Sequence, residues 1–235
     1  MAFGQRSAQS NAQFGPNTKV YFVSIKEKDL EQPYFEIKVK DDSGKYVIVG
    51  AISDKIKYLG GTLIGLKNKT FKYEGKDIES TTATFIDKAK DEAYLLTISQ
   101  GYLGRNILNS ILNLKTFEGL ELGLYVSKPK EGQTKGFHSV ALRQNGVLIY
   151  GKFKAEELPK INKVKVGKDV HSDASEINAF YTKQVEEFAK VVQAAVPPAS
   201  VASAPAATAE HETVSAEDAA AFNANGDPEE EVTLP

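Results

Sequence analysis

Aromatic and basic residues share the same parity in several segments that are rich in β-branched and aromatic side chains. Alternate residues of a β-strand lie on one face, so Tyr34, Lys38 and Lys40 would share a face. The same parity joins Lys67, Lys69, Phe71 and Tyr73. Aromatic rings stack on bases and ammonium groups contact phosphates, and a surface for single-stranded nucleic acid combines the two. The recurrence over several strands favours this interpretation more than any one strand does.

Later segments extend the candidate set. An expected strand over 147–154 would place Tyr150, Lys152 and Lys154 on one face, and its hairpin partner would pair Phe137 with Arg143. Lys135 lies in an expected basic loop, 128–136, and the polar face of an expected helix carries Tyr102 and Arg105 beside Asn106 and Asn109. The expected stacking residues are Tyr34, Phe71, Tyr73, Tyr102, Phe137 and Tyr150. The expected phosphate contacts are Lys38, Lys40, Lys67, Lys69, Arg105, Lys135, Arg143, Lys152 and Lys154. The alternative is an ordinary solvated sheet face, which also carries lysine.

Catalytic motifs are absent from the sequence. The chain has no Cys and only three His, and we find no phosphate-binding Gly loop, nucleophile elbow or HExxH helix. His138 stands alone on an expected strand, where a packed or hydrogen-bonded role is the common one. We therefore expect a protein that is not an enzyme and has no cofactor or metal. A nuclease with dispersed acidic ligands stays open as a rival.

Charge is divided sharply along the chain. Residues 1–168 hold 27 Lys and Arg against 18 Asp and Glu, a surplus of nine positive charges. Residues 169–235 hold 2 Lys and 13 acidic residues, a surplus of eleven negative charges, so the total of −2 conceals a basic body and an acidic end. A basic body indicates a polyanionic partner that is held through phosphate contacts and counterion release.

The body must be mainly β to position these residues. Short β-branched or aromatic runs predict strands at 19–25, 34–40, 45–52, 62–66, 70–74, 81–86, 92–100, 120–127, 137–144 and 147–154. The first three should form a meander with a turn at 41–44, and Asn145-Gly146 is a strong hairpin signal. Gly60-Gly61 should interrupt the stretch that follows the meander. Helical spacing predicts one internal helix over 101–114, with an apolar stripe that includes Leu103, Ile107 and Ile111.

The two ends differ from the body in composition. Residues 1–17 predict a flexible arm, 18–168 the nucleic-acid-binding domain, and 169–194 an amphipathic helix that either caps the body or pairs with another subunit. Residues 195–235 form an Ala/Pro linker and an acidic tail, which we expect to be disordered because it has too few apolar groups to offset its ordering entropy. No signal peptide or membrane span is expected, and the expected location is the cytoplasm.

The order of these parts resembles the replicative single-stranded DNA-binding proteins. Their OB-fold body is followed by a mobile linker and an acidic tail that ends in a few apolar residues. The resemblance covers the overall organisation and the last nine residues, and the compact body resembles a bacteriophage-encoded version, which would work in the host cytoplasm. It implies that the tail docks on replication proteins through Asp227, Glu229, Glu230, Glu231, Val232 and Leu234. The tail lacks the terminal aromatic residue of the bacterial pattern.

Together these observations predict a partly closed, mostly antiparallel barrel of OB type with one internal helix, a C-terminal helix and the acidic tail. It would coat single-stranded DNA with little sequence preference during replication, recombination or repair, with the tail used for docking or for shielding the binding surface. A virion or other structural protein with a basic face, and an RNA-binding regulator, are the alternatives. A homo-oligomer also stays open.

Overall fold

The computed structural model describes residues 14, 17–27, 33–50, 58–73, 76–128, 136–166 and 169–195 of the 235-residue chain. At positions 50, 71, 73, 76, 166, 169 and 170 it describes the backbone alone. The described part is mainly β, with two α-helices and one short 3-10 helix. The strands are β1 (Lys19–Lys26), β2 (Tyr34–Lys40), β3 (Tyr46–Gly50), β4 (Tyr58–Tyr73), β5 (Lys76–Asp87), β6 (Glu92–Ser99), β7 (Leu120–Val126), β8 (His138–Gln144), β9 (Val147–Ile149), β10 (Asn162–Val166) and β11 (Asp169–Asp173), and the helices are α1 (Tyr102–Ile111), η1 (Ala155–Glu157) and α2 (Ser175–Ala195).

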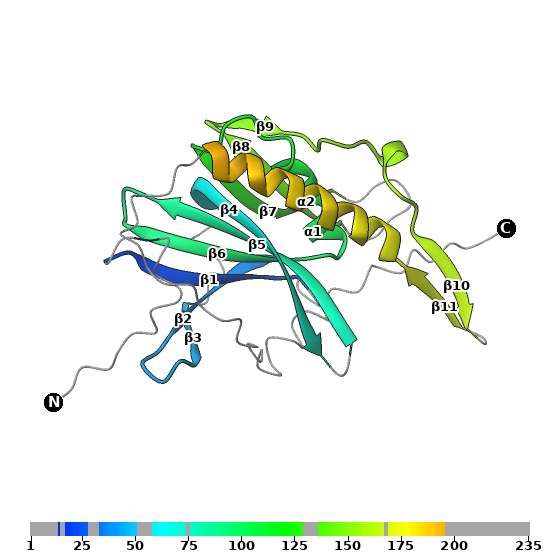
Figure 1. Cartoon of the computed structure of the whole chain (residues 1–235), viewed down its shortest axis with the longest axis horizontal. Coiled ribbons are helices and arrows are strands. Elements are labelled where there is room, and N and C mark those ends of the chain that lie inside the picture. The colour runs from blue at the N-terminus through cyan, green and yellow to red at the C-terminus, as the bar shows by residue number, and fades with distance from the viewer. Residues whose placement is uncertain are drawn as a thin grey trace.

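Nine strands form one mixed sheet in the order β3-β2-β1-β6-β5-β4-β7-β8-β9 (Figure 1). The expected meander of the first three strands is confirmed, because β1 pairs with β2 and β2 with β3, both antiparallel. The β1–β6 pair is parallel and the other seven pairs of this sheet are antiparallel, so the sheet is mostly antiparallel, as expected. Within the described residues the edge strands β3 and β9 do not pair with each other, so the sheet does not form a closed barrel.

Strand β4 corrects the prediction that Gly60-Gly61 interrupts the chain. The expected strands 62–66 and 70–74 are one strand of 16 residues, which starts before the two glycines. Its first four residues pair with β7 and the rest pair with β5, with a register shift between Leu63 and Gly65. Gly61 has a φ of 134°, and a Cβ there would lie 2.4 Å from the carbonyl oxygen of Ile86. The glycines therefore let β4 bend and pass from one partner strand to the next.

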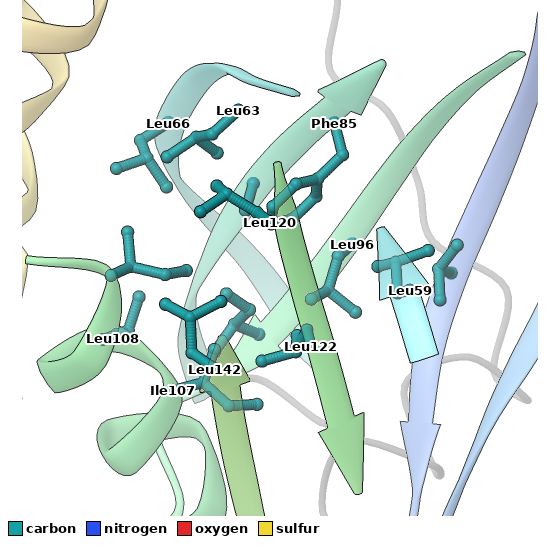
Figure 2. Packing of buried hydrophobic residues seen from close by; sticks show 14 of the residues in the cluster. Leu59, Leu63, Leu66, Phe85, Leu96, Ile107, Leu108, Leu120, Leu122 and Leu142 are labelled. Carbon is teal, nitrogen blue, oxygen red and sulfur yellow. The ribbon is translucent and has the colours of Figure 1, made fainter. Parts of the chain in front are cut away.

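The hydrophobic core lies between one face of this sheet and the two helices. Leu63, Phe85, Leu96 and Leu122 from the strands are fully buried, as is Ile107 of α1. Figure 2 shows the α1 side chains meeting those of β7 and β8. The predicted apolar stripe of the internal helix is confirmed, since its members are all buried: Leu103, Ile107, Leu108, Ile111, Leu112 and Leu114.

Helix α2 packs on the body, which was one of the two arrangements that the sequence allowed. Tyr181 and Val185 are about 1% exposed, and the Asn68 side-chain amide of β4 donates a 2.9 Å hydrogen bond to the carbonyl of Thr182. The Asp173 carboxylate accepts a 2.9 Å hydrogen bond from the backbone N–H of Ser175 at the start of the helix. These contacts hold α2 on the same side of the sheet as the core.

Both predicted hairpin turns are confirmed, and one hairpin was not predicted. Asn145 and Gly146 have φ values of 49° and 81° between β8 and β9. In the turn at 41–44, Gly44 has a φ of 81°, and the Asp41 carboxylate accepts the backbone N–H of Ser43 at 2.9 Å. Strands β10 and β11 form a separate two-stranded sheet that was not predicted. The helix expected over 169–194 therefore begins only at Ser175, because Asp169–Asp173 is strand β11.

Candidate nucleic-acid interface

The face of the nine-stranded sheet that points away from the core and helices is called the outer face below. Residues that are directly opposite in neighbouring strands point to the same side of a sheet. The register pairs Phe22 with Lys38 and Lys26 with Tyr34. Phe22 and Lys26 alternate with Val23 of the buried core, so all four residues lie on the outer face. The shared parity predicted for Tyr34, Lys38 and Lys40 is confirmed.

Lys40 lies over two aromatic rings at the edge of the outer face. Its Nζ is 5.7 Å from the ring centroid of Phe22 and 5.2 Å from that of Tyr46, which lies opposite Lys40 in β3. The two rings meet edge to face, with centroids 4.9 Å apart. Tyr46 keeps 39% of its surface exposed. An ammonium group and an accessible ring therefore stand side by side, as phosphate and base contacts require.

Glu36 organises the neighbouring cations. Its carboxylate is buried, lies 3.4 Å from Lys26 Nζ and 3.3 Å from Lys38 Nζ, and accepts a 3.4 Å hydrogen bond from Ser24 Oγ. One carboxylate thus faces two ammonium groups. The pairing fixes both lysines on the outer face, because a buried carboxylate needs partners.

A strip of hydroxyl side chains lies in the middle of the outer face, on β5 and β6. Thr82 lies opposite Thr97 in one direction and opposite Lys67 in the other, and Ser80 lies opposite Lys69. Ser80 and Thr82 are buried, whereas Lys67 and Lys69 of β4 are exposed. Short polar side chains are therefore flanked by basic rows on β2 and β4.

The outer face continues across β7 and β8 with a second cation and aromatic pair. The guanidinium carbon of Arg143 is 6.0 Å from the ring centroid of Tyr58, and Arg143 Nη1 is 3.5 Å from the Tyr58 hydroxyl. Tyr58 and Tyr125 are 46% and 45% exposed. Phe137, which directly precedes β8, has the parity of Arg143 and is half-buried. Phe137 and Arg143 therefore share a face, as predicted, whereas the neighbouring Leu142 is buried in the core.

Arg105 is the clearest correction among the expected phosphate contacts. Its side chain is 6% exposed, and Nη1 donates a 2.6 Å hydrogen bond to the carbonyl of Gln100. The same nitrogen is 3.3 Å from the side-chain oxygen of Asn178 in α2. Arg105 therefore joins α1 to β6 and α2, and the helical pattern could not reveal this because α2 comes from a distant part of the sequence. Tyr102, one residue into α1, is 50% exposed.

The predicted strand over 147–154 ends at Ile149, so its parity argument is wrong beyond that residue. Asn109 of α1 donates from Nδ2 to the carbonyl of Phe153 and accepts the Phe153 N–H at Oδ1, both at 2.9 Å. Asn113 Nδ2 donates to the carbonyl of Tyr150 at 3.2 Å. The chain after β9 thus runs along α1, and Tyr150, Lys152 and Lys154 are exposed there rather than on the outer face.

Some predicted residues lie outside what the structure describes. Phe71 and Tyr73 belong to β4, but their side chains are outside the described part, as is all of Lys135. The tail residues Asp227, Glu229, Glu230, Glu231, Val232 and Leu234 are outside it as well. The sequence analysis missed five aromatic or basic residues of the outer face: Phe22, Lys26, Tyr46, Tyr58 and Tyr125. The alternation of Phe22 with Val23 could have indicated the first two, whereas the three tyrosines required the register.

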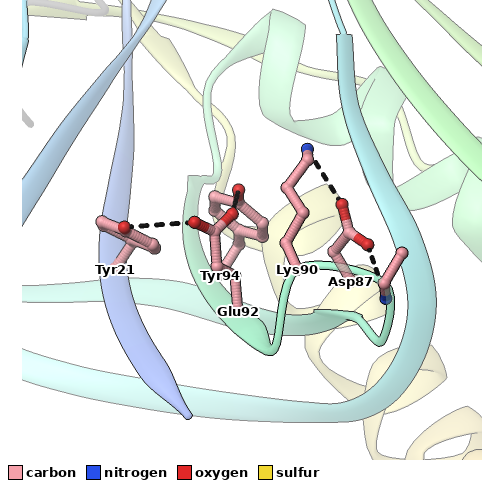
Figure 3. A network of polar contacts seen from close by, with 6 residues as sticks. Tyr21, Asp87, Lys90, Glu92 and Tyr94 are labelled. Atoms are coloured by element: carbon pink, nitrogen blue, oxygen red, sulfur yellow. Dashed lines mark hydrogen bonds and ion pairs between the residues drawn. The ribbon is translucent and has the colours of Figure 1, made fainter.

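A polar network at the β5–β6 turn lies apart from the outer face (Figure 3). Glu92 accepts hydrogen bonds from the Tyr21 hydroxyl, at 3.3 Å, and from the Tyr94 hydroxyl. Burial, reinforced by the Glu92 carboxylate, raises the pKa of Tyr94 well above its usual value. In the turn itself, Lys90 lies 2.9 Å from Asp87 and lowers the pKa of that carboxyl.

Among the described residues, no group of three or more His, Cys, Asp or Glu side chains gathers as a candidate metal site. Neither of the helices described has the length and apolar character needed to cross a membrane.

Comparison of the chain with protein-family models, with curated proteins and with solved structures finds no match.

Proposed function

We propose that this protein binds single-stranded DNA on the outer face of its sheet and coats it with little sequence preference. The observation that carries the proposal is the register of β1, β2, β3 and β4. It brings exposed tyrosine and lysine side chains from separate segments together on the outer face, the side of the sheet on which α1 and α2 do not pack. Stacking on accessible rings and phosphate contacts from ammonium groups bind any base sequence. The proposed role is in DNA replication, recombination or repair, with the acidic tail as a docking segment or a shield.

The proposed fold is an OB-type barrel that is only partly closed. His138 starts β8 and Glu27 follows β1, and four strands separate β1 from β8 in the sheet order. The His138 imidazole nitrogen Nδ1 is nevertheless 3.8 Å from the Glu27 carboxylate. The sheet must therefore curl strongly to bring the two together, which supports partial closure.

Salt dependence tests the proposal first. Binding of fluorescein-labelled oligo(dT) to the full chain, followed by anisotropy, should weaken linearly in a plot of log K against log salt, because each phosphate contact releases counterions. Replacing Lys67 and Lys69 by Ala should make the slope shallower by about 1.4, at about 0.7 per contact. The control replaces the exposed Lys183 and Lys190 of α2, on the other side of the sheet. Equal slopes for the two double variants would rule out the outer face.

Stacking is tested by a pair of tyrosine variants. Tyr46→Ala removes an exposed ring from the outer face, and Tyr102→Ala removes one from α1. A stacked base contributes about 1–3 kcal/mol, so Tyr46→Ala should weaken oligo(dT) binding by about five-fold or more. The Tyr102→Ala variant should bind as the unmodified protein does. The opposite result would place the DNA along α1, beside Tyr150, Lys152 and Lys154.

Competition between DNA and RNA oligomers addresses the alternative of an RNA-binding regulator, because the 2′-OH is the constant difference between them. A virion protein with a basic face would show neither the salt slope nor the effect of Tyr46→Ala.

A further inference from the structure

The β10–β11 hairpin stands outside the main sheet. The two strands pair only with each other, over five residues each. Figure 1 shows the hairpin projecting beyond the N-terminal end of α2, away from the nine-stranded sheet. An isolated two-stranded ribbon is marginally stable in water. Because the hairpin pairs with no strand of the main sheet, it does not help to build the core.

The register separates the charges of the hairpin between its two faces. Lys163 lies opposite Ser172 and Lys165 opposite Val170, so one face of the ribbon presents two lysines and no acidic residue. The acidic residues Asp169 and Asp173 belong to the other parity, opposite Val166 and Asn162. Both lysine side chains are exposed. The two lysines therefore share one face of the hairpin with Ser172, and Asp173 belongs to the other face.

We propose that this basic face is a second nucleic-acid contact, which binds the phosphate backbone of the strand that leaves the outer face. The inference rests on the proposed function of the outer face and extends its footprint. Lys163 and Lys165 are two residues apart, roughly 6.6 Å along an extended strand. That spacing corresponds to the rise of about two nucleotides in a stacked strand, so each lysine could meet its own phosphate.

The placement of the hairpin fits such a continuous path. The distal part of the β4–β5 hairpin projects on the same side of the body as β10 and β11 (Figure 1). Lys67 and Lys69 lie on the outer face of β4 as it runs toward that end. A nucleic-acid strand that follows β4 beyond its lysines therefore leaves the sheet at the side of the body where β10 and β11 project.

Oligonucleotide length provides the test, because only a longer strand can reach both surfaces. The full chain and the Lys163→Ala/Lys165→Ala double variant are titrated with oligo(dT) of about 6 and about 24 nucleotides, lengths on either side of the usual footprint of an OB domain. The Lys183→Ala/Lys190→Ala protein is the matched control. For the long oligomer, the hairpin variant should show a salt slope shallower by about 1.4. For the short oligomer it should match the unmodified protein.

Three results would overturn the inference. Identical slopes for the hairpin variant and the unmodified protein at both lengths would leave the hairpin without a contact. Equal weakening at both lengths would place the lysines inside the minimal footprint. A loss that appears only when the same titration is made with a DNA duplex in place of oligo(dT) would indicate that the ribbon enters a major groove, which is wide enough to admit one.

This experiment distinguishes a failure of the hairpin proposal from a failure of the proposed outer-face binding. If Lys67→Ala/Lys69→Ala weakens binding at both lengths while the hairpin variant does not, only the hairpin is excluded. If neither double variant differs from the control, the proposed function fails as well. Far-UV circular dichroism of each variant checks that the fold is kept.

Discussion

Asn109 determines where the chain runs after β9. Its side-chain amide holds the backbone N–H and carbonyl of Phe153 at once, and its backbone carbonyl accepts the Lys152 N–H at 3.0 Å. A Cβ on Gly151 would lie 2.4 Å from the Asn109 side chain, so only glycine permits this approach. An amide on the polar face of a helix is often solvated, and its sequence position does not show that it binds a distant segment.

Replacing Asn109 by Ala should therefore destabilise the protein. The substitution leaves the Phe153 N–H and carbonyl without these partners, which costs about 1–3 kcal/mol when such groups are buried. Urea unfolding followed by circular dichroism measures the change. Asn113→Ala, which removes one 3.2 Å bond at a more exposed position, is the comparison and should cost less. Equal losses would show that the two hydrogen bonds to Phe153 do not hold the segment.

Tyr94 predicts a loss of stability at alkaline pH. The pKa of Tyr94 is raised from 10.0 by burial and by the Glu92 carboxylate, so the folded protein keeps the phenol proton where the unfolded chain has lost it. Between about pH 9 and pH 11 the unfolded state binds fewer protons, and the free energy of unfolding must fall as pH rises. In Tyr94→Phe this fall should be smaller, as measured by urea midpoints across that range. Tyr125→Phe, at an exposed position, should follow the unmodified protein.

At the scale of elements, sequence periodicity predicted which strands and helices exist better than it predicted where they begin and end. The β1–β3 meander, α1 and the 145–146 turn were found because local signals set them: alternation, a helical stripe and residues that tolerate positive φ. The length of β4 depends on two partner strands, and the short β9 depends on Asn109 and Asn113, so neither could be read locally. The β10–β11 hairpin was missed because Lys163–Asp173 has polar residues on both faces.

At Gly104 in α1 we expect the usual helix preference for alanine over glycine to be reversed. Alanine in place of an interior helix glycine normally stabilises by about 1 kcal/mol. A Cβ at position 104 would lie 1.7 Å from the carbonyl oxygen of Ser99, at the end of β6. We expect Gly104→Ala to destabilise the fold by about 1–3 kcal/mol, since the helix must move off the sheet. Thermal unfolding measures this, with Asn106→Ala as a control on the same helix. A rise in Tm would mean that α1 does not approach β6 so closely.

At the scale of the whole molecule, the alternation of residues along each strand predicted part of the candidate site. The rest of the site became visible only from the order of the strands in the sheet. Tyr34, Lys38, Lys40, Lys67 and Lys69 were found because each strand alternates regularly. Parity alone could not show that β2 and β4 present these residues on the same face, because that depends on strand order. The prediction that Arg105 contacts phosphate was wrong for a similar reason, since the helix that buries its side chain lies about 70 residues further along the chain.

The charge division along the chain gives the last prediction. Residues 196–235 contain eight acidic and no basic residues, so a chain that ends at Ala195 changes from a net charge of −2 to +6. If the tail competes for the basic outer face, its removal should tighten oligo(dT) binding most at low ionic strength. The Debye length falls from about 30 Å at 0.01 M to about 3 Å at 1 M salt, so the gap between the two proteins should close as salt is added. Equal affinities at low salt would exclude shielding and leave the tail only its docking role. A gap that persists at high salt would point to a non-electrostatic contact, which the scarcity of large apolar residues in the tail argues against.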